Sequence, residues 1–233
     1  MSEETVAMHA HYTSEGQDVH GYLSRPVAAG PWPGVVLVHA YMGMGDHYRD
    51  LARRLSREGF VVLAPDLYHG EAAEDHAQAA RLKAELDVDR AVTEMLDGAD
   101  YLHSLPYVSA GEGVLGFCMS GGLALLAAAR GGLDGAVAYY PSLYPDADVL
   151  ARIDCPVQLH YGTADEITPA SEMTAIREAF DDGAVDYEYH EYEGADHAFL
   201  NDTYDRRYHA EAAAEAWERT VEFFRANLRG DGQ

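Results

Sequence analysis

A cysteine occupies the position in this sequence that is best suited to present a nucleophile. Cys118 lies in LGFCMSGG, residues 115–122, between a short apolar run and the alanine-rich stretch LALLAAAR. Gly116 and Ser120 are small residues two positions before and after it, which lets a chain turn sharply from a strand into a helix. The N–H groups at the start of that helix favour a thiolate. The motif alone is also compatible with a buried, inert cysteine, and Ser120 is a second candidate nucleophile.

A base and an acid follow in the order that such a nucleophile requires. Asp165 lies in HYGTADEITP and His197 in YEGADHAFL, and each comes directly after a predicted strand. Nucleophile, acid and histidine follow one another in this order in α/β-hydrolases. Either residue alone has an ordinary interpretation, an N-cap for Asp165 and a solvated surface group for His197. Asp196 is the alternative acid, although sequence neighbours seldom face each other well.

The elements that must hold these side chains alternate between apolar runs and helical patterns. The runs, at residues 34–40, 60–67, 113–120, 135–141 and 155–162, with the alternating 186–192, indicate strands. They predict an α/β fold, a doubly wound, mostly parallel sheet with helices on both faces, whose carboxyl edge carries the three residues. Residues 6–26, which turn at Glu15-Gly16, indicate an antiparallel edge hairpin, and residues from about 204 to 228 a closing amphipathic helix.

Length and composition limit what else the chain can be. Residues 1–233 fit a single domain, with no repeat, long linker or large cap domain. The net charge of −24 argues against nucleic acid or an anionic membrane as a partner. No export signal or membrane span is visible, and Cys118 and Cys155 form no C-x-x-C pair, so we expect a cytoplasmic protein. We expect no metal, because paired-ligand histidine spacings are missing, and no cofactor.

The charged residues also suggest a salt-rich environment. Lys83 is the single lysine beside fifteen arginines, and the 40 acidic residues are spread along the chain. This balance resembles that of proteins from salt-loving organisms, and an acidic enzyme from an ordinary organism is the alternative.

Taken together, the motifs resemble the dienelactone hydrolase family of α/β-hydrolases over nearly the whole chain. The resemblance rests on GFCMSGG, GTADEITP and GADHAF, with VVLVHAYMG and VVLAPDLYHG upstream. It implies a cysteine-dependent hydrolase that cleaves a small-molecule ester or lactone through Cys118, Asp165, His197 and a thioester acyl-enzyme. It also implies an oxyanion hole formed by the backbone N–H groups of Tyr41 and Met119. We expect a monomer or small homo-oligomer.

Two departures from the family pattern concern the substrate. Ala40 stands where the family has a glutamate before the oxyanion-hole donor, and Asn201 where it has a carboxylate-binding arginine four residues after the histidine. A substrate other than dienelactone is therefore expected. The candidate substrate-binding residues, each of which could instead be ordinary packing or surface residues, are Tyr68, His69, Tyr140, Tyr144 and Asn201.

Two other functions stay open from the sequence. The same triad could cleave another acyl bond, such as a thioester. A catalytically silent fold could instead bind a small ligand or sense oxidants through Cys118.

Overall fold

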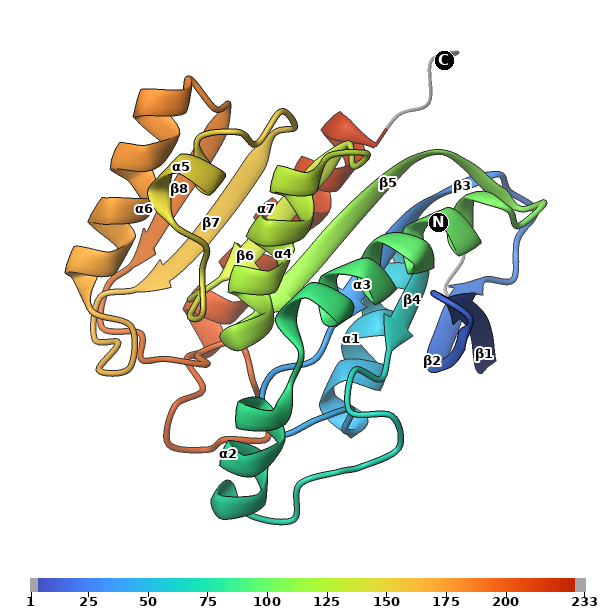
Figure 1. Ribbon diagram of the computed structural model, residues 1–233, viewed down its shortest axis with the longest axis horizontal. Helices are drawn as coiled ribbons and strands as arrows, with labels where there is room; N and C mark the ends of the chain where they lie inside the picture. Colours follow the sequence, from blue (N-terminus) through green and yellow to red (C-terminus); the bar gives the residue numbers. More distant parts are fainter. Residues whose placement is uncertain (1–3, 229–233) are drawn as a thin grey trace. The chain divides into compact units, whose positions relative to one another are not determined.

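The computed structural model describes residues 4–228 (Figure 1). By their internal contacts these residues form two compact units. The first unit contains residues 4–114 together with Leu228, and the second contains Leu115–Asn227. Strand β5, Val108–Phe117, begins in the first unit and ends in the second. That residues 1–233 behave as a single domain stays a prediction. Among the described residues, no helix has both the length and the apolarity to cross a bilayer.

The strands of the first unit run in the order β1, β2, β4, β3. They span Thr5–Ser14, Gln17–Pro26, Val61–Pro65 and Trp32–Val38. Strands β1 and β2 are antiparallel, β2 and β4 are antiparallel, and β3 and β4 are parallel. The β1–β2 turn is made by Glu15 and Gly16, both with positive φ (47° and 78°), as a two-residue hairpin turn requires. The predicted edge hairpin is confirmed.

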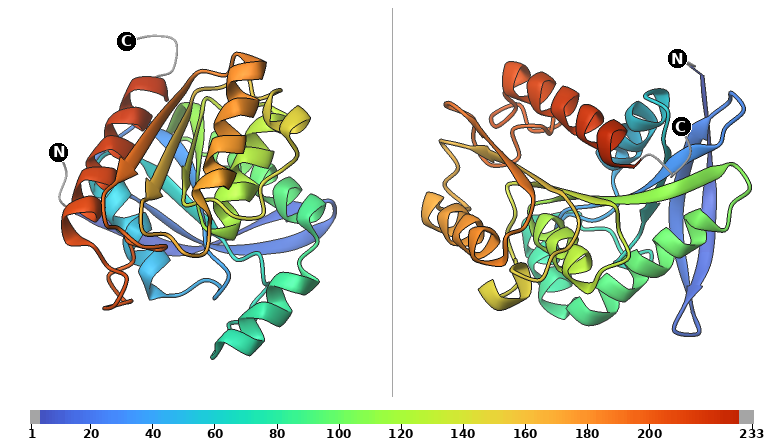
Figure 2. Two further views of the ribbon diagram at one scale, coloured as in Figure 1. Left: turned by 90° about the vertical axis from the view of Figure 1, so that its left-hand side faces the viewer. Right: turned by 90° about the horizontal axis from the view of Figure 1, so that it is seen from above.

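Three helices complete the first unit: α1, Asp46–Arg57, α2, His76–Glu85, and α3, Val88–His103. Helices α1 and α3 cover opposite faces of the β3–β4 pair (Figure 2). They do so because each carries one apolar stripe, with Leu51 and Leu55 buried on α1 and Met95 and Leu102 buried on α3.

The second unit repeats this layering around three parallel strands. These are β6, Gly135–Tyr139, β7, Val157–Gly162, and β8, Tyr187–Tyr192. Strands β6 and β7 are buried along their whole length, as expected of strands covered on both faces. The helices of this unit, α4, α5, α6 and α7, span Met119–Arg130, Ala147–Leu150, Ala170–Gly183 and Ala210–Asn227. Helix α7 lies on one face of the second unit, with α4 and α6 on the other (Figure 2).

The closing helix begins later than the sequence predicts. It starts at Ala210 rather than near residue 204. The preceding residues form turns instead, because the His209 N–H donates to the Phe199 carbonyl at 3.0 Å. The first helical bond of this segment runs from the Ala213 N–H to the His209 carbonyl, at 2.8 Å. The apolar periodicity thus correctly predicted the helix, but it did not predict the residue at which the helix begins.

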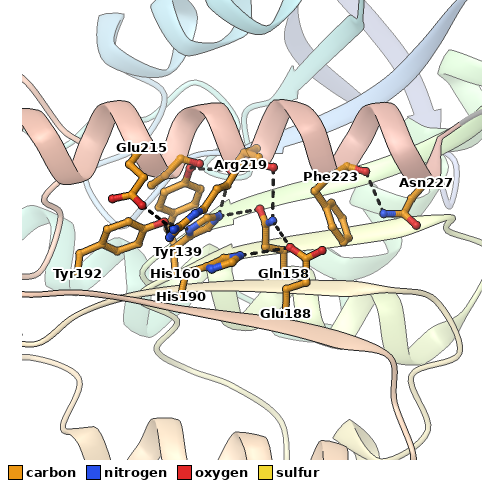
Figure 3. Close-up of polar contacts among 12 residues, drawn as sticks. Tyr139, Gln158, His160, Glu188, His190, Tyr192, Glu215, Arg219, Phe223 and Asn227 are labelled. Atoms are coloured by element: carbon orange, nitrogen blue, oxygen red, sulfur yellow. Dashed lines mark hydrogen bonds and ion pairs between the residues drawn. The ribbon is translucent and has the colours of Figure 1, made fainter.

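A buried polar network joins α7 to the three strands of the second unit (Figure 3). His160 on β7, which has no exposed surface, contacts the Tyr192 hydroxyl through Nδ1 at 2.8 Å. Its Nε2 lies 2.8 Å from Gln158 Oε1 and 3.1 Å from Thr220 Oγ1 of α7. The Tyr139 ring stacks on the same imidazole at 4.2 Å. Burial holds the pKa of His160 well below its ordinary value, so the network is built around a neutral imidazole.

Candidate active site

Cys118 sits at a sharp turn between β5 and α4. Its backbone has φ 56° and ψ −118°, a conformation that is unusual for a residue with a side chain. The turn brings the backbone of Ser120 so close to Gly116 that a Cβ there would lie 2.0 Å from the Ser120 carbonyl oxygen. Glycine is therefore required at position 116. The Cys118 N–H donates to the Tyr139 carbonyl at 3.0 Å, which ties the turn to the end of β6.

Ser120, the alternative nucleophile, is fully buried within this turn. Its hydroxyl accepts the Phe117 N–H at 2.8 Å and donates to the Phe117 carbonyl at 3.0 Å. Both bonds close the turn that carries Cys118. The structure therefore gives Ser120 a structural role, whereas Cys118 is only partly buried.

Asp165 and His197 come together after β7 and β8. Oδ2 of Asp165 lies 2.8 Å from Nδ1 of His197, and both side chains are almost fully buried. The other carboxylate oxygen, Oδ1, accepts the N–H groups of Ile167 and Thr168, each at 2.8 Å. These three bonds fix the carboxylate, and an acceptor at Nδ1 places the ring proton there, so that Nε2 is left as the basic nitrogen.

Asp196 does not reach the imidazole ring in this way. Its Oδ1 accepts the backbone N–H of His197 at 2.6 Å, and its Oδ2 lies 3.7 Å from Nε of Arg207. Asp165 is the carboxylate that orients the ring.

Cys118 and His197 interact electrostatically. Burial alone would raise the pKa of the Cys118 thiol, but His197, Ser142 and the Met119 N–H outweigh it, so this pKa lies below its ordinary value. Burial would likewise lower the pKa of His197, and the contacts with Asp165 and Cys118 instead raise it to about 9. Nε2 of His197 is buried and makes no regular hydrogen bond within the described residues. Hydrogen bonds between a catalytic base and its nucleophile are often long without a substrate and shorten when the substrate binds.

Two residues near the thiol were missed by sequence reasoning. The Ser142 hydroxyl lies 3.5 Å from Cys118 Sγ, and the Ser142 N–H donates to the Cys118 carbonyl at 2.8 Å. Burial raises the pKa of the Tyr204 phenol, an effect that Arg207 opposes and the charge of Cys118 reinforces. Ser142 follows the end of β6 and could have been suspected from that placement. Tyr204 could not, because it fell within the helix that the sequence predicted.

The candidate substrate-binding residues of the second unit lie in different environments. Tyr140 is buried beside the base, with its ring centroid 4.8 Å from that of His197. Its N–H donates to the His160 carbonyl at 2.7 Å, which links it to the buried network. Tyr144 is half-buried before α5. The Asn201 side chain is buried, and its Oδ1 accepts the N–H and hydroxyl of Thr203 at 3.0 and 2.7 Å.

The remaining candidates belong to the first unit. The Tyr68 hydroxyl donates to the Tyr41 carbonyl at 3.1 Å, and the Tyr41 hydroxyl contacts Nδ1 of His76. Tyr68 and His69 both line a pocket of that unit. Their part in substrate binding, and that of the Tyr41 N–H in an oxyanion hole, stay predictions.

Comparison with known proteins identifies the family. The model of the dienelactone hydrolase family matches residues 19–228. A Yersinia pestis protein provisionally named carboxymethylenebutenolidase is 33% identical over 233 residues, 91% of this chain and 85% of its own. A Bradyrhizobium protein provisionally named 2-oxo-3-(5-oxofuran-2-ylidene)propanoate lactonase is 30% identical, over 99% of this chain and 98% of its own.

The solved structures agree with the family match. A crystal structure from Klebsiella pneumoniae, of a protein provisionally named dienelactone hydrolase, is 28% identical with a TM-score of 0.89, over 95% of this chain and 99% of its own. The predicted α/β-hydrolase fold, with helices on both faces of a mixed sheet, is confirmed by this likeness. The chain belongs to the dienelactone hydrolase family and is a carboxylic ester or lactone hydrolase.

Proposed function

We propose that the chain hydrolyses small-molecule esters or lactones through Cys118 as nucleophile, His197 as base and Asp165 as the group that orients the base. The observation that carries this proposal is the 2.8 Å contact between Oδ2 of Asp165 and Nδ1 of His197, which leaves Nε2 as the basic nitrogen. The charges agree with it, because His197 lowers the pKa of the Cys118 thiol, and Asp165 together with Cys118 raises the pKa of the imidazole to about 9. A thiolate and an imidazolium are the forms in which a cysteine nucleophile and its acid–base partner begin acyl transfer.

In the first half of the reaction, the Cys118 thiolate adds to the substrate carbonyl carbon and forms a C–S bond. The carbonyl electron pair moves to oxygen, where the Met119 N–H at the start of α4 is the protein's donor. When the oxyanion collapses, the C–O bond to the alcohol oxygen breaks. The His197 imidazolium gives its Nε2 proton to that oxygen, and a thioester remains on Cys118. From an ester the alcohol leaves, whereas from a lactone the new hydroxyl group stays on the acyl chain.

In the second half, neutral His197 takes a proton from water through Nε2 and the resulting hydroxide adds to the thioester carbonyl. Collapse breaks the C–S bond, and the product is a carboxylic acid, with Cys118 restored as thiolate and His197 as imidazolium. Asp165 stays ionised and bonded to Nδ1 throughout, which stabilises the imidazolium.

The substrate class follows from charge. The family's carboxylate-binding arginine is replaced by Asn201, and Oδ1 of that residue is occupied by Thr203. The net charge of −24 repels anions further. We therefore propose that neutral esters and lactones are better substrates than those that carry a free carboxylate, and that dienelactone is not the preferred one.

The test is a panel of p-nitrophenyl esters, p-nitrophenyl thioesters and neutral and carboxylate-bearing lactones. It is run on wild type, Cys118→Ala, His197→Ala and the matched control Cys155→Ala, which removes the other thiol. We expect kcat/KM to fall by roughly a thousandfold or more in the first two variants, and to stay close to wild type in the control.

Each other result of this panel has a definite meaning. Faster cleavage of thioesters than of oxygen esters would make the chain a thioesterase with the same triad. Wild-type protein that cleaves nothing, but loses the free Cys118 thiol to dilute peroxide, would be the oxidant-sensing alternative. Near wild-type turnover by Cys118→Ala would contradict the cysteine mechanism.

A further inference from the structure

The Ser142 hydroxyl lies beside the sulfur of Cys118 in the second unit. Ser142 belongs to the loop between β6 and α5, elements that can be followed in Figure 1. Its Oγ is 3.5 Å from Sγ of Cys118, and this sulfur is its one side-chain partner among the described residues. No step of the proposed reaction yet uses this hydroxyl.

The backbone around Ser142 is fixed by the turn that carries Cys118. The Ser142 N–H donates to the Cys118 carbonyl at 2.8 Å. The loop packs so closely against the start of α4 that a Cβ on Gly122 would lie 2.3 Å from the Ser142 carbonyl oxygen. The Thr168 hydroxyl donates to the Pro141 carbonyl at 3.4 Å, which ties the loop to the segment that follows β7. The hydroxyl is therefore held near the sulfur before any substrate binds, and a donor placed in advance needs no reorganisation during the reaction.

The charge on the sulfur decides the direction of this hydrogen bond. A neutral thiol and a hydroxyl can each donate to the other, and the bond between them is weak. A thiolate carries no proton, so after ionisation the Ser142 O–H is the donor and the Cys118 sulfur is the acceptor. Hydrogen bonds to an ionised acceptor are roughly twice as strong as those between neutral groups. The contact therefore favours the thiolate over the thiol.

The other groups around the sulfur agree with this direction. Burial raises the pKa of the Cys118 thiol, but His197, Ser142 and the Met119 N–H together lower it below its ordinary value. Nε2 of His197 makes no regular hydrogen bond within the described residues. The Ser142 hydroxyl, in contrast, is already within hydrogen-bond distance of the sulfur.

We propose that Ser142 is a catalytic residue whose hydroxyl donates to the Cys118 sulfur whenever that sulfur is negatively charged. This role rests on the cysteine mechanism proposed for Cys118. It applies to the resting thiolate, and again to the second half of the reaction, when the C–S bond of the acyl-enzyme breaks and its electron pair returns to the sulfur. The Ser142 proton stays on its own oxygen throughout, so no proton is transferred.

The first measurement is the rate at which iodoacetamide alkylates Cys118 across pH. It is made on wild type, Ser142→Ala, Ser142→Thr and the matched control Ser171→Ala, with folding checked by circular dichroism. Ser142→Ala removes the hydroxyl and keeps the backbone N–H that bonds the Cys118 carbonyl. Ser171 is exposed on α6, so the loss of its hydroxyl should not change the reactivity of the thiol.

We expect Ser142→Ala to raise the apparent pKa of Cys118 by about one pH unit, because a hydrogen bond to a charged group is worth about that much. At low pH, alkylation should be roughly threefold slower, since tenfold less thiolate is partly offset by the greater nucleophilicity of a more basic thiolate. At high pH, where the thiol is ionised in every variant, the same nucleophilicity should make alkylation roughly threefold faster than in wild type. Ser142→Thr, which keeps a hydroxyl, and Ser171→Ala should both follow the wild-type curve.

The second measurement is the rate at which the acyl-enzyme formed from a p-nitrophenyl ester loses its acyl group. Without the hydroxyl, the departing thiolate is less stabilised, so Ser142→Ala should lose the acyl group severalfold more slowly than wild type. Ser142→Thr and Ser171→Ala should lose it at close to the wild-type rate.

Three results would overturn the proposal. An unchanged pKa of Cys118 in Ser142→Ala would show that the hydroxyl does not stabilise the thiolate. Alkylation slowed by the same factor at every pH, in Ser142→Ala and Ser142→Thr alike, would show that Ser142 only shapes the turn. Unchanged loss of the acyl group in Ser142→Ala would remove its role in the second half of the reaction. Alkylation needs no ester cleavage, so these results are distinct from a failure of the proposed function, which is tested by the turnover of Cys118→Ala.

Discussion

Cys118 should be reactive before any substrate binds. The contact with His197 lowers the pKa of the thiol, so the thiolate fraction should rise at a lower pH than for an ordinary cysteine, whose pKa is about 8.5. Burial raises the pKa of Cys155 to about 12, so the second thiol should stay unreactive over the same range. The measurement is iodoacetamide alkylation across pH, with the two peptides resolved by mass spectrometry.

Asp165→Asn is the matched variant for this titration. The neutral amide no longer stabilises the imidazolium, so the apparent pKa of Cys118 should rise and alkylation near neutral pH should slow. An apparent pKa for Cys118 at or above that of an ordinary thiol in the wild-type protein would mean that activation requires substrate.

The sequence predicted the candidate catalytic residues more reliably than it predicted the residues around them. Cys118, Asp165 and His197 follow strand-end motifs with strong local patterns, and the structure brings Asp165 against His197. The hydrogen bonds between the Ser120 hydroxyl and the Phe117 backbone could not be predicted from the sequence. A serine two residues after a nucleophile gives the same sequence pattern whether it closes the turn or faces solvent. Ser142 approaches the thiol from a loop whose path no periodicity specifies.

The packing of helix α7 against the strands of the second unit should depend on His160. Replacing it by leucine leaves the Tyr192 hydroxyl, Gln158 and Thr220 without this partner. Each buried polar group that loses its partner costs about 1–3 kcal/mol. Three such groups cost at least about 3 kcal/mol, so we expect His160→Leu to unfold at least about 6–12 °C below wild type, at roughly 2–4 °C per kcal/mol for a chain of this size. The matched control is His9→Gln, on the exposed face of β1.

The same histidine should make stability fall in acid. Its pKa is held well below the ordinary value in the folded state, so below about pH 6.5 the unfolded chain binds a proton that the folded chain does not. Between pH 7 and pH 5.5, this single site should remove about 1.2 kcal/mol from the free energy of unfolding. Urea titrations at the two pH values should show a smaller loss for His160→Leu than for wild type. An equal loss in both proteins would contradict the assignment.

The sequence predicted the positions of the strands well, but it did not predict which side chains of the strands and helices contact one another. The alternating residues 186–192 correctly indicated β8, and the apolar runs indicated β6 and β7. Nothing in those patterns showed that His160 would meet Thr220, sixty residues away. The start of α7 was also missed, because the bond from His209 to Phe199 that delays it is a tertiary contact.

Raising the salt concentration should stabilise the folded protein. The 40 acidic and 16 basic residues give a net charge of −24, and this self-repulsion opposes the compact state in dilute buffer. At about 1 M salt the Debye length is about 3 Å, so most surface repulsion is screened. We expect the melting temperature to rise from low to molar KCl, and similarly in NaCl. A flat or falling melting temperature would remove the salt-adapted interpretation without affecting the catalytic one.

The single-domain prediction can be checked on the same molecule. Although the described residues form two compact units, strand β5 belongs to both, so we expect the units to unfold together. Scanning calorimetry should give one transition, with equal calorimetric and van't Hoff enthalpies. Two separable transitions would show that the units are independent domains.

The cysteine mechanism requires a covalent intermediate at Cys118, which rapid-quench mass spectrometry of the enzyme mixed with a p-nitrophenyl ester can detect. We predict that the peptide containing Cys118 gains the mass of the acyl group within the first turnover, that hydroxylamine removes it as expected of a thioester, and that Cys118→Ala shows no such gain. An acyl group on Ser120, or rapid ester cleavage with an unmodified Cys118 at every quench time, would contradict the mechanism.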